Sequence, residues 1–295
     1  MEDRGVLRGP LRASGAIQAV SMSTLLAPLL DPAVGERGVV LSVHGSAVNF
    51  VVDGALVTIA SVGMGGLPNA LLVADPFDPR ALGVRAGMLV TTADGELAIG
   101  DARIRITLRD ARQWCPDLAA LPIVHGLLVR CGVVRQCAAR SVGGLDGMVP
   151  GREVLAALAD AFGSGSESMI AEAGRRLVGL GAGLTPSGDD VLVGVTAALT
   201  ALGDDRARPL ARLWARHAIG RTTVVAEAFH RHAAAGAYSE RLHDVLRAIL
   251  AGPVAAIPAA VRTAAAWGAT SGIDTLAGIL MGLELPRAGA ECGAA

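Results

Sequence analysis

A stretch of sixteen residues, GLGAGLTPSGDDVLVG at 179–194, gathers residue types that bind anions or metal ions. It holds five glycines, the hydroxyls of Thr185 and Ser187, and the adjacent carboxylates Asp189 and Asp190. Glycines let backbone N–H groups turn toward one point, and the first turn of a helix leaves its N–H donors unpaired. The stretch therefore predicts a small-anion site at the start of a buried helix, and the residues expected around the ligand are Gly181, Gly183, Thr185, Ser187 and Gly188.

The paired carboxylates leave the chemistry of this site open. Asp189 and Asp190, with Asp274, would hold a Mg²⁺ ion that bridges to a phosphate. Alternatively, one carboxylate would hydrogen-bond the NH₂ group of an amide or ureido substrate. The sequence requires no cofactor, Mg²⁺ is the one that it admits, and it contains no zinc-binding or P-loop motif.

The segment SGDDVLVG at 187–194 recurs as SGIDTLAG at 271–278, with five of eight positions identical. In each copy a Ser and an Asp stand three residues apart at a predicted helix start, which is the spacing of a capping box. A purely structural capping role accounts for either copy taken alone. The recurrence predicts an internal duplication of the helical region, which would bring Ser271 and Asp274 into the anion site.

Arg221 and Thr222 supply the cation and the hydroxyl that an anion site needs. An arginine beside a helix start offers a bidentate fork for phosphate or carboxylate, although an N-cap next to a surface arginine is the plainer interpretation. Asp189, Asp190 and Arg221 are the predicted catalytic residues.

Four histidine and asparagine positions complete the list of candidates. His44 and Asn49 lie on adjoining predicted strands and are expected to face a cleft. His230 and His232 stand two residues apart on a predicted helix, so they point in different directions and are expected to be exposed rather than to share a metal.

The composition excludes several classes of protein. All 26 basic residues are Arg against 27 acidic ones, so there is neither a lysine nucleophile nor a net charge that would attract nucleic acid. Four cysteines without a CxxC pair fit a reducing compartment. With no secretory signal and no apolar run of about 18 residues, we expect a cytoplasmic protein that does not contact a membrane.

The pattern along the chain predicts an α+β fold. Residues 1–37 are expected to be a leader with a short helix at 15–30, and 38–109 a mostly antiparallel β domain of six to eight strands, because the connections are too short for crossover helices. Residues 110–285 are expected to be α-helical and 286–295 a disordered tail. The expected helices span 119–140, 152–162, 167–180, 191–202, 206–219, 222–235, 239–251, 254–268 and 273–284.

The motif GLGAGLTPSGDD resembles the signature of a bacterial domain-of-unknown-function family that includes the AllH-type subunit of oxamate carbamoyltransferase. The resemblance extends to VHGSAVNF at 43–50, to RTTVVAEAFHRHAAAGAYSE at 221–240 and to WGATSGIDTLAGILMGL at 267–283. It implies carbamoyl transfer between oxalurate and phosphate, which yields oxamate and carbamoyl phosphate in allantoin degradation, a branch of purine catabolism. It also implies partner subunits that resemble FdrA and AllG.

Three functions remain open at this point. The favoured one is a carbamoyltransferase-complex subunit that binds phosphate or a carbamoyl-phosphate-like anion at 179–190, with Arg221 neutralising its charge. The second is a non-catalytic scaffold or regulatory subunit, in which the loop is only a structural joint. The third is a stand-alone enzyme that uses Mg²⁺ and a phosphate ester.

Overall fold

The computed structural model describes residues 16–30, 37–100, 104–139, 141–146, 148 and 151–285. The leader expected before residue 15 and the tail expected over 286–295 lie outside these ranges. The described residues up to 22, together with 26–64 and 70–113, form one compact unit, which we call the barrel unit. Residues 23–25 and 65–69, with those from 114 onward, form a second one, the helical unit.

The barrel unit is a closed sheet. Its strands follow the order β5-β4-β3-β2-β6-β7-β8-β1, and β5 pairs with β1 to close the ring, while β9 adds to the outer side of β1. Apolar side chains such as Phe50, Ile59, Leu71 and Leu97 fill the interior. The strands in the described residues are β1 (Ile17–Ser23), β2 (Arg37–Val43), β3 (Ala47–Val52), β4 (Ala55–Ser61), β5 (Ala70–Val73), β6 (Leu89–Ala93), β7 (Glu96–Ile99), β8 (Ile104–Thr107) and β9 (Arg112–Trp114).

The barrel is mixed, so the prediction of a mostly antiparallel domain was wrong in part. β4 and β5 run parallel, as do β1 and β8. The prediction failed because a parallel pair of short strands needs no crossover helix. Thr58 lies opposite Ala70, so the connection over 62–69 must return only about 10 Å along β4, a length that eight residues span easily.

The start of the described chain also differs from the prediction. The helix expected over 15–30 is instead strand β1 followed by a single 3₁₀ turn at Thr24–Leu26. Gln18 and Val20 are exposed while Ala19 and Ser21 are buried, which is the alternation of a strand with one face in a core. The small residues in this segment hide that alternation in the sequence.

The helical unit follows the predicted pattern closely, which confirms the α+β class. Its helices are α1 (Leu127–Ala138), α2 (Gly151–Ser164), α3 (Glu167–Leu177), α4 (Ser187–Leu202), α5 (Ala207–Ala218), α6 (Val224–Ala235), α7 (Glu240–Leu250), α8 (Ile257–Ala265) and α9 (Ser271–Glu284). The helix expected over 119–140 is shorter than predicted, because it begins only after Gly126, which has a left-handed φ of 78°. None of the helices in the described part of the chain is both long enough and apolar enough to cross a membrane.

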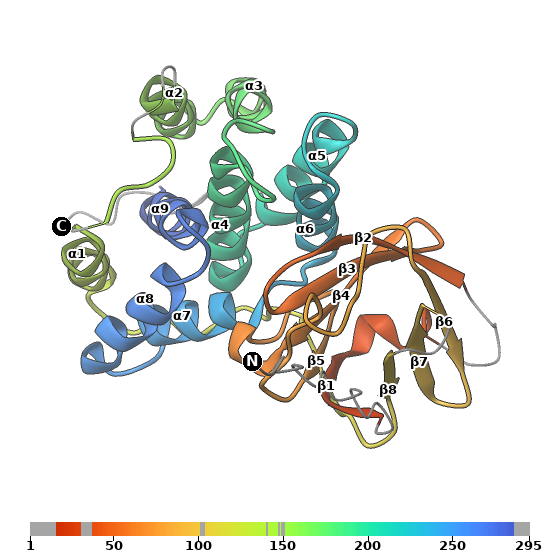
Figure 1. Cartoon of the computed structure of the whole chain (residues 1–295). Helices are drawn as coiled ribbons and strands as arrows, with labels where there is room; N and C mark the ends of the chain where they lie inside the picture. Colours follow the sequence, from red (N-terminus) through yellow and green to blue (C-terminus); the bar gives the residue numbers. More distant parts are fainter. Residues whose placement is uncertain are drawn as a thin grey trace, which may run out of the picture. The chain divides into compact units, whose positions relative to one another are not determined.

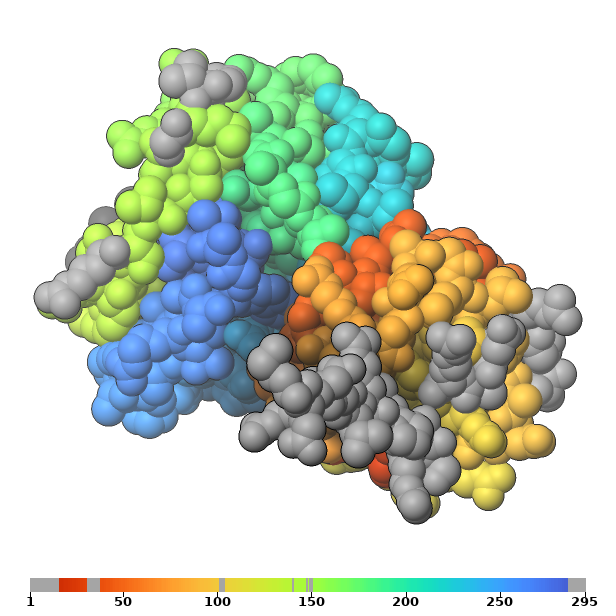
Figure 2. Space-filling model, viewed as in Figure 1, coloured from red at the N-terminus to blue at the C-terminus, as the bar shows by residue number. Residues whose placement is uncertain are grey.

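Helices α4 and α9 pack side by side at the centre of the helical unit (Figure 1). They cross at two glycines: a Cβ atom on Gly194 would lie 2.2 Å from the carbonyl oxygen of Thr275, and one on Gly278 would lie 2.0 Å from that of Val191. In Figure 2 the surface of this unit shows the green residues of α2–α4 in contact with the blue ones of the last helices. Segments far apart in sequence therefore meet where both copies of the repeated motif end.

Candidate functional site

The loop 179–186 connects α3 to α4 and is shaped by its own backbone. Gly179 has a φ of 74°, and a Cβ atom there would lie 2.3 Å from the carbonyl oxygen of Arg221. Only glycine combines this left-handed conformation with such a close approach. The glycine at the start of the motif thus lets the loop pack against the turn before α6.

The first-turn N–H groups of α4 are largely used within the chain. The N–H of Gly188 donates to the carbonyl of Leu180 at 2.8 Å, and the N–H groups of Asp189 and Asp190 donate to that of Pro186 at 2.9 and 3.1 Å. These donors were expected to hold an external anion. In the structure they stabilise the helix start and the loop instead.

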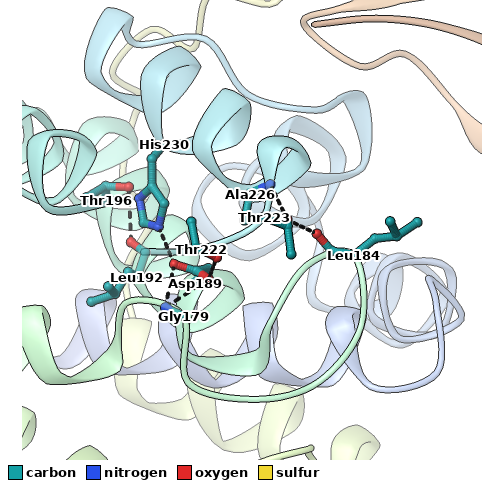
Figure 3. Close-up of polar contacts among 9 residues, drawn as sticks. All are labelled: Gly179, Leu184, Asp189, Leu192, Thr196, Thr222, Thr223, Ala226 and His230. Carbon is teal, nitrogen blue, oxygen red and sulfur yellow. Dashed lines mark hydrogen bonds and ion pairs between the residues drawn. The ribbon is translucent and has the colours of Figure 1, made fainter. Parts of the chain in front are cut away.

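Asp189 is enclosed by donors from three other segments (Figure 3). Its oxygens accept hydrogen bonds from the N–H of Gly179 at 3.1 and 3.2 Å and from the hydroxyl of Thr222, and one oxygen lies 2.8 Å from Nε2 of His230. The residue is only 2% exposed. Asp189 therefore joins the loop and α4 to α6, and we call this group of four residues the Asp189 joint.

His230 corrects one expectation from the sequence. Instead of being exposed it is 2% exposed and packs against Asp189, 41 positions away in the chain. The turn that precedes it is also fixed, because the hydroxyl of Thr223 donates to the carbonyl of Leu184 and accepts the N–H of Ala226 at 3.1 Å (Figure 3). Thr223 thus caps α6 and holds the exposed part of the loop at the same time.

Asp190 has a different environment from its neighbour. Its Oδ2 atom is buried, and no group in the described part of the chain hydrogen-bonds it. Burial raises the pKa of this carboxyl well above its usual range, the hydroxyls of Ser271 and Thr185 act in the opposite direction, and the nearby Asp274 raises it further. Asp190 is therefore held toward its neutral form, in which a carboxyl group both donates and accepts a hydrogen bond.

Asp274 is the counterpart of Asp190 on α9. It accepts the N–H of Gly144 at 2.9 and 3.2 Å, and burial raises its pKa while the hydroxyls of Ser187 and Thr270 lower it. The contacts are reciprocal: a serine of α9 approaches the aspartate of α4, and a serine of α4 approaches the aspartate of α9. The reciprocal contacts between α4 and α9 are enough to explain why the two motif copies share these residues. An internal duplication therefore stays a prediction.

A pocket of about 610 Å³, counted to its open mouth, lies in the helical unit above Asp190. Asp190, Thr185 and Ser271 form one polar group in its wall, and the hydroxyl oxygens of Thr185 and Ser271 are 2.9 Å apart. Much of the remaining wall is apolar. The other lining residues are Pro68, Val193, Phe229, His232, Ala237, Tyr238, Ser239, Arg241, Leu242, Ala264, Trp267, Gly272 and Thr275.

Three of these residues form one aromatic and cationic group. The guanidinium of Arg241 lies 5.3 Å from the ring centroid of Trp267, and the ring of Phe229 meets that of Trp267 edge to face at 6.5 Å. Burial and the charge of Arg231 lower the pKa of His232 to about 4, so this histidine is neutral at pH 7. Sequence reasoning missed the role of this group, although Phe229 lies in the segment 221–240, Trp267 lies in the segment 267–283 and Arg241 directly follows the first of them.

The structure brings together some of the predicted site residues and separates others. Thr185, Asp190 and Ser271 line the pocket. Ser187 and Asp189 are buried in the first turn of α4, and Asp274 is buried in the first turn of α9. Gly181 and Gly183 lie in the loop. Arg221 is exposed and is not among the residues that line the pocket, while Thr222 bonds to Asp189.

His44 and Asn49 belong to the barrel unit, where they take part in a chain of hydrogen bonds. Ser42 lies 3.1 Å from Nε2 of His44 and accepts the amide N–H of Asn49 at 3.1 Å, and Thr58 donates to the amide oxygen of Asn49 at 2.8 Å. Burial and the charge of Arg80 lower the pKa of His44. These residues form a polar group between strands β2, β3 and β4.

Among the described residues, no group of three or more His, Cys, Asp or Glu side chains is placed to hold a metal ion.

Comparison with known families gives two matches along the chain. The model for the AllH family N-terminal domain matches residues 18–113, and the model described as oxamate carbamoyltransferase subunit AllH matches residues 177–283. No curated protein and no solved structure matches the chain. The two matched ranges contain the barrel strands and the segment from α4 to α9 with the pocket. Since they cover well over half of its length, the chain belongs to the AllH family.

Proposed function

We propose that this chain is a subunit of an oxamate carbamoyltransferase-like complex and that its pocket holds the carbamoyl group of a ureido acid. Membership of the AllH family supports the first part, because the matching family model is described as a subunit of that enzyme. The observation that carries the second part is Asp190, a buried carboxyl whose Oδ2 atom has no partner among the described residues. An unpaired buried oxygen costs about 1–3 kcal/mol, which a ligand with matching groups would recover.

The chemistry of Asp190 fits a neutral amide better than a phosphate. A neutral carboxyl group presents one donor and one acceptor side by side, and a carbamoyl group presents the complementary C=O and N–H pair. Thr185 and Ser271 add hydroxyl groups, each of which can either donate or accept a hydrogen bond. Arg241, in the pocket wall, provides the positive charge for the carboxylate end of the same molecule.

The reaction needs one proton transfer that Asp190 is suited to assist. When an oxygen of phosphate attacks the ureido carbon, a C–O bond forms and the C–N bond to the oxamate part breaks, so the leaving nitrogen gains the proton that phosphate gives up. A carboxyl with a raised pKa can donate to that nitrogen and recover a proton from phosphate. In this proposal Arg241 takes the role expected for Arg221, and FdrA-like and AllG-like subunits complete the enzyme of cytoplasmic allantoin breakdown.

Calorimetric titration of the full chain with oxalurate tests the proposal. We expect Asp190→Ala to weaken binding at least about tenfold, because one hydrogen-bonded pair is lost. Asp190→Asn should keep most of the affinity, since an amide is neutral and also has a donor and an acceptor. Arg241→Ala should weaken binding about tenfold, whereas Arg221→Ala, its exposed control, should bind like the unmodified chain. Equal affinity of the unmodified chain and Asp190→Ala would contradict the proposal.

A scaffold role is the second candidate, and the Asp189 joint favours it. A site that only connects the loop to α6 would need the hydrogen bonds to Gly179, Thr222 and His230 and nothing further. In that case Asp190→Ala would lower the melting temperature or weaken assembly with partner subunits, and no ureido acid would protect the chain against unfolding.

A role for Mg²⁺, which the sequence admits but does not require, stays a prediction. A stand-alone enzyme that acts on a phosphate ester with Mg²⁺ would bind that ester only when the metal is present. Calorimetry with phosphate and carbamoyl phosphate, with and without Mg²⁺, separates this Mg²⁺-dependent function from the carbamoyl proposal. Binding that does not change with metal would exclude this third function.

A further inference from the structure

The pocket above Asp190 is more apolar than a ligand as polar as oxalurate requires. Beyond Asp190, Thr185 and Ser271, the wall includes the side chains of Val193, Phe229, Leu242, Ala264 and Trp267. A molecule that is polar on every side would leave this wall in contact with water.

The aromatic part of the wall is also arranged before any ligand binds. Phe229 stands at 87° to Trp267, and Arg241 lies over the ring of Trp267 and donates to the carbonyl oxygen of Thr263 at 3.2 Å. The orientation of Trp267 is thus fixed from two sides. A fixed indole ring is a good surface for a planar apolar group, because little side-chain entropy is lost on binding.

We propose that the pocket selects ureido acids with an apolar, preferably aromatic, substituent, whose carbamoyl group lies on Asp190 and whose substituent packs against Trp267 and Phe229. The assignment of the carbamoyl group rests on the function proposed above, whereas the apolar subsite rests on the wall alone. Burial of apolar surface favours binding, so a benzyl group should add at least about tenfold in affinity. Trp267 and Phe229 are then specificity-determining residues.

A matched pair of ligands tests this inference on the full chain. N-carbamoylglycine and N-carbamoyl-L-phenylalanine share the ureido and carboxylate groups and differ only in the benzyl group. We expect calorimetry to give an affinity at least about tenfold higher for the phenylalanine compound. In Trp267→Ala the two affinities should become nearly equal, while Trp267→Phe should keep most of the difference.

Control variants separate an effect on the subsite from an effect on folding. Arg262→Ala changes an exposed residue of α8 that does not line the pocket, and it should leave both affinities unchanged. If Trp267→Ala does not fold, Phe229→Leu keeps an apolar side chain in the wall and should reduce the difference between the ligands about threefold. Circular dichroism and the melting temperature identify the variants that are folded.

The possible results distinguish this inference from the proposed function. If both ligands bind equally and Asp190→Ala abolishes both, the apolar subsite is wrong and the carbamoyl proposal stands. If the phenylalanine compound binds more tightly but Asp190→Ala has no effect, the subsite stands and the carbamoyl assignment is wrong. If neither ligand binds, both the carbamoyl proposal and the apolar subsite are wrong. If a folded Trp267→Ala protein still prefers the phenylalanine compound, the apolar subsite is wrong.

Discussion

The two adjacent carboxylates at the start of α4 differ in what surrounds them. Asp189 faces α6, where an N–H, a hydroxyl and an imidazole nitrogen surround its oxygens. Asp190 faces the pocket, and its Oδ2 atom has no partner among the described residues. A buried polar group with all its partners stabilises the fold, whereas one without a partner is available to a ligand. The DD pair of the motif thus combines a structural residue with a candidate binding residue.

The largest expected effect comes from breaking the Asp189 joint. Asp189→Ala leaves the N–H of Gly179, the hydroxyl of Thr222 and His230 without their buried acceptor, so it should lower the free energy of unfolding by about 3–5 kcal/mol. Urea denaturation measures this change. Asp190→Asn is the matched control and, at pH 5, should change stability much less than Asp189→Ala does, because the amide is neutral like the carboxyl group that it replaces. Similar losses for both variants would mean that the two carboxylates have the same role.

A smaller effect should appear in the pH dependence of stability. The raised pKa of Asp190 means that the folded protein holds this proton more tightly than the unfolded chain does. The resulting stabilisation is complete below about pH 4 and is lost as the pH rises through the raised pKa, at up to about 1.4 kcal/mol per pH unit.

Asp190→Asn removes the contribution of Asp190 to this pH dependence. Denaturation at pH 5 and pH 8 should therefore show the unmodified chain losing stability relative to Asp190→Asn at the higher pH. Asp274, whose pKa is also raised, is present in both proteins, so its own contribution largely cancels. A difference that stays constant between the two pH values would show that Asp190 is ionised over the whole range.

The smallest effect concerns two threonines, of which one lies beside the Asp189 joint and the other lines the pocket. Thr223 caps α6 beside the Asp189 joint, so Thr223→Ala should cost about 1 kcal/mol of stability and leave ligand affinity unchanged. Thr185 lines the pocket, so Thr185→Ala should change affinity more than stability. Thermal unfolding and calorimetry of both variants measure the contrast, and a reversed pattern would place the binding site on the other side of α4.

Much of the helical unit could be predicted because residues next to the helix ends, such as caps and glycines, mark where each helix begins and ends. Gly203 and Gly236 end α4 and α6 in left-handed conformations, and Ser166 and Thr223 cap the helices that follow them. The barrel was harder to predict. Whether β4 and β5 run parallel depends on whether the connection over 62–69 returns along β4 before β5 begins, which local sequence does not encode.

The motif indicated the segment that forms the candidate site, but it did not separate the roles of Asp189 and Asp190. Whether Asp189 or Asp190 is free to bind depends on His230, which no spacing rule connects to the loop. The same holds for Trp267, which was noted only as part of a similar segment, and for Arg241, which was not noted at all. Arg221 was favoured because it adjoins a helix start, yet its side chain is exposed. Distances between segments far apart in sequence decide these roles.

The glycine crossing of α4 and α9 has a consequence for how this pocket can change during evolution. At Gly194 and Gly278 the two helices touch through backbone atoms, so no side chain sets their separation. Substitutions in the wall, at Phe229, Leu242 or Trp267, can therefore alter the size and shape of the cavity without moving Asp190 relative to Ser271. Related chains can therefore differ in the apolar part of the cavity while the end at Asp190 keeps its dimensions.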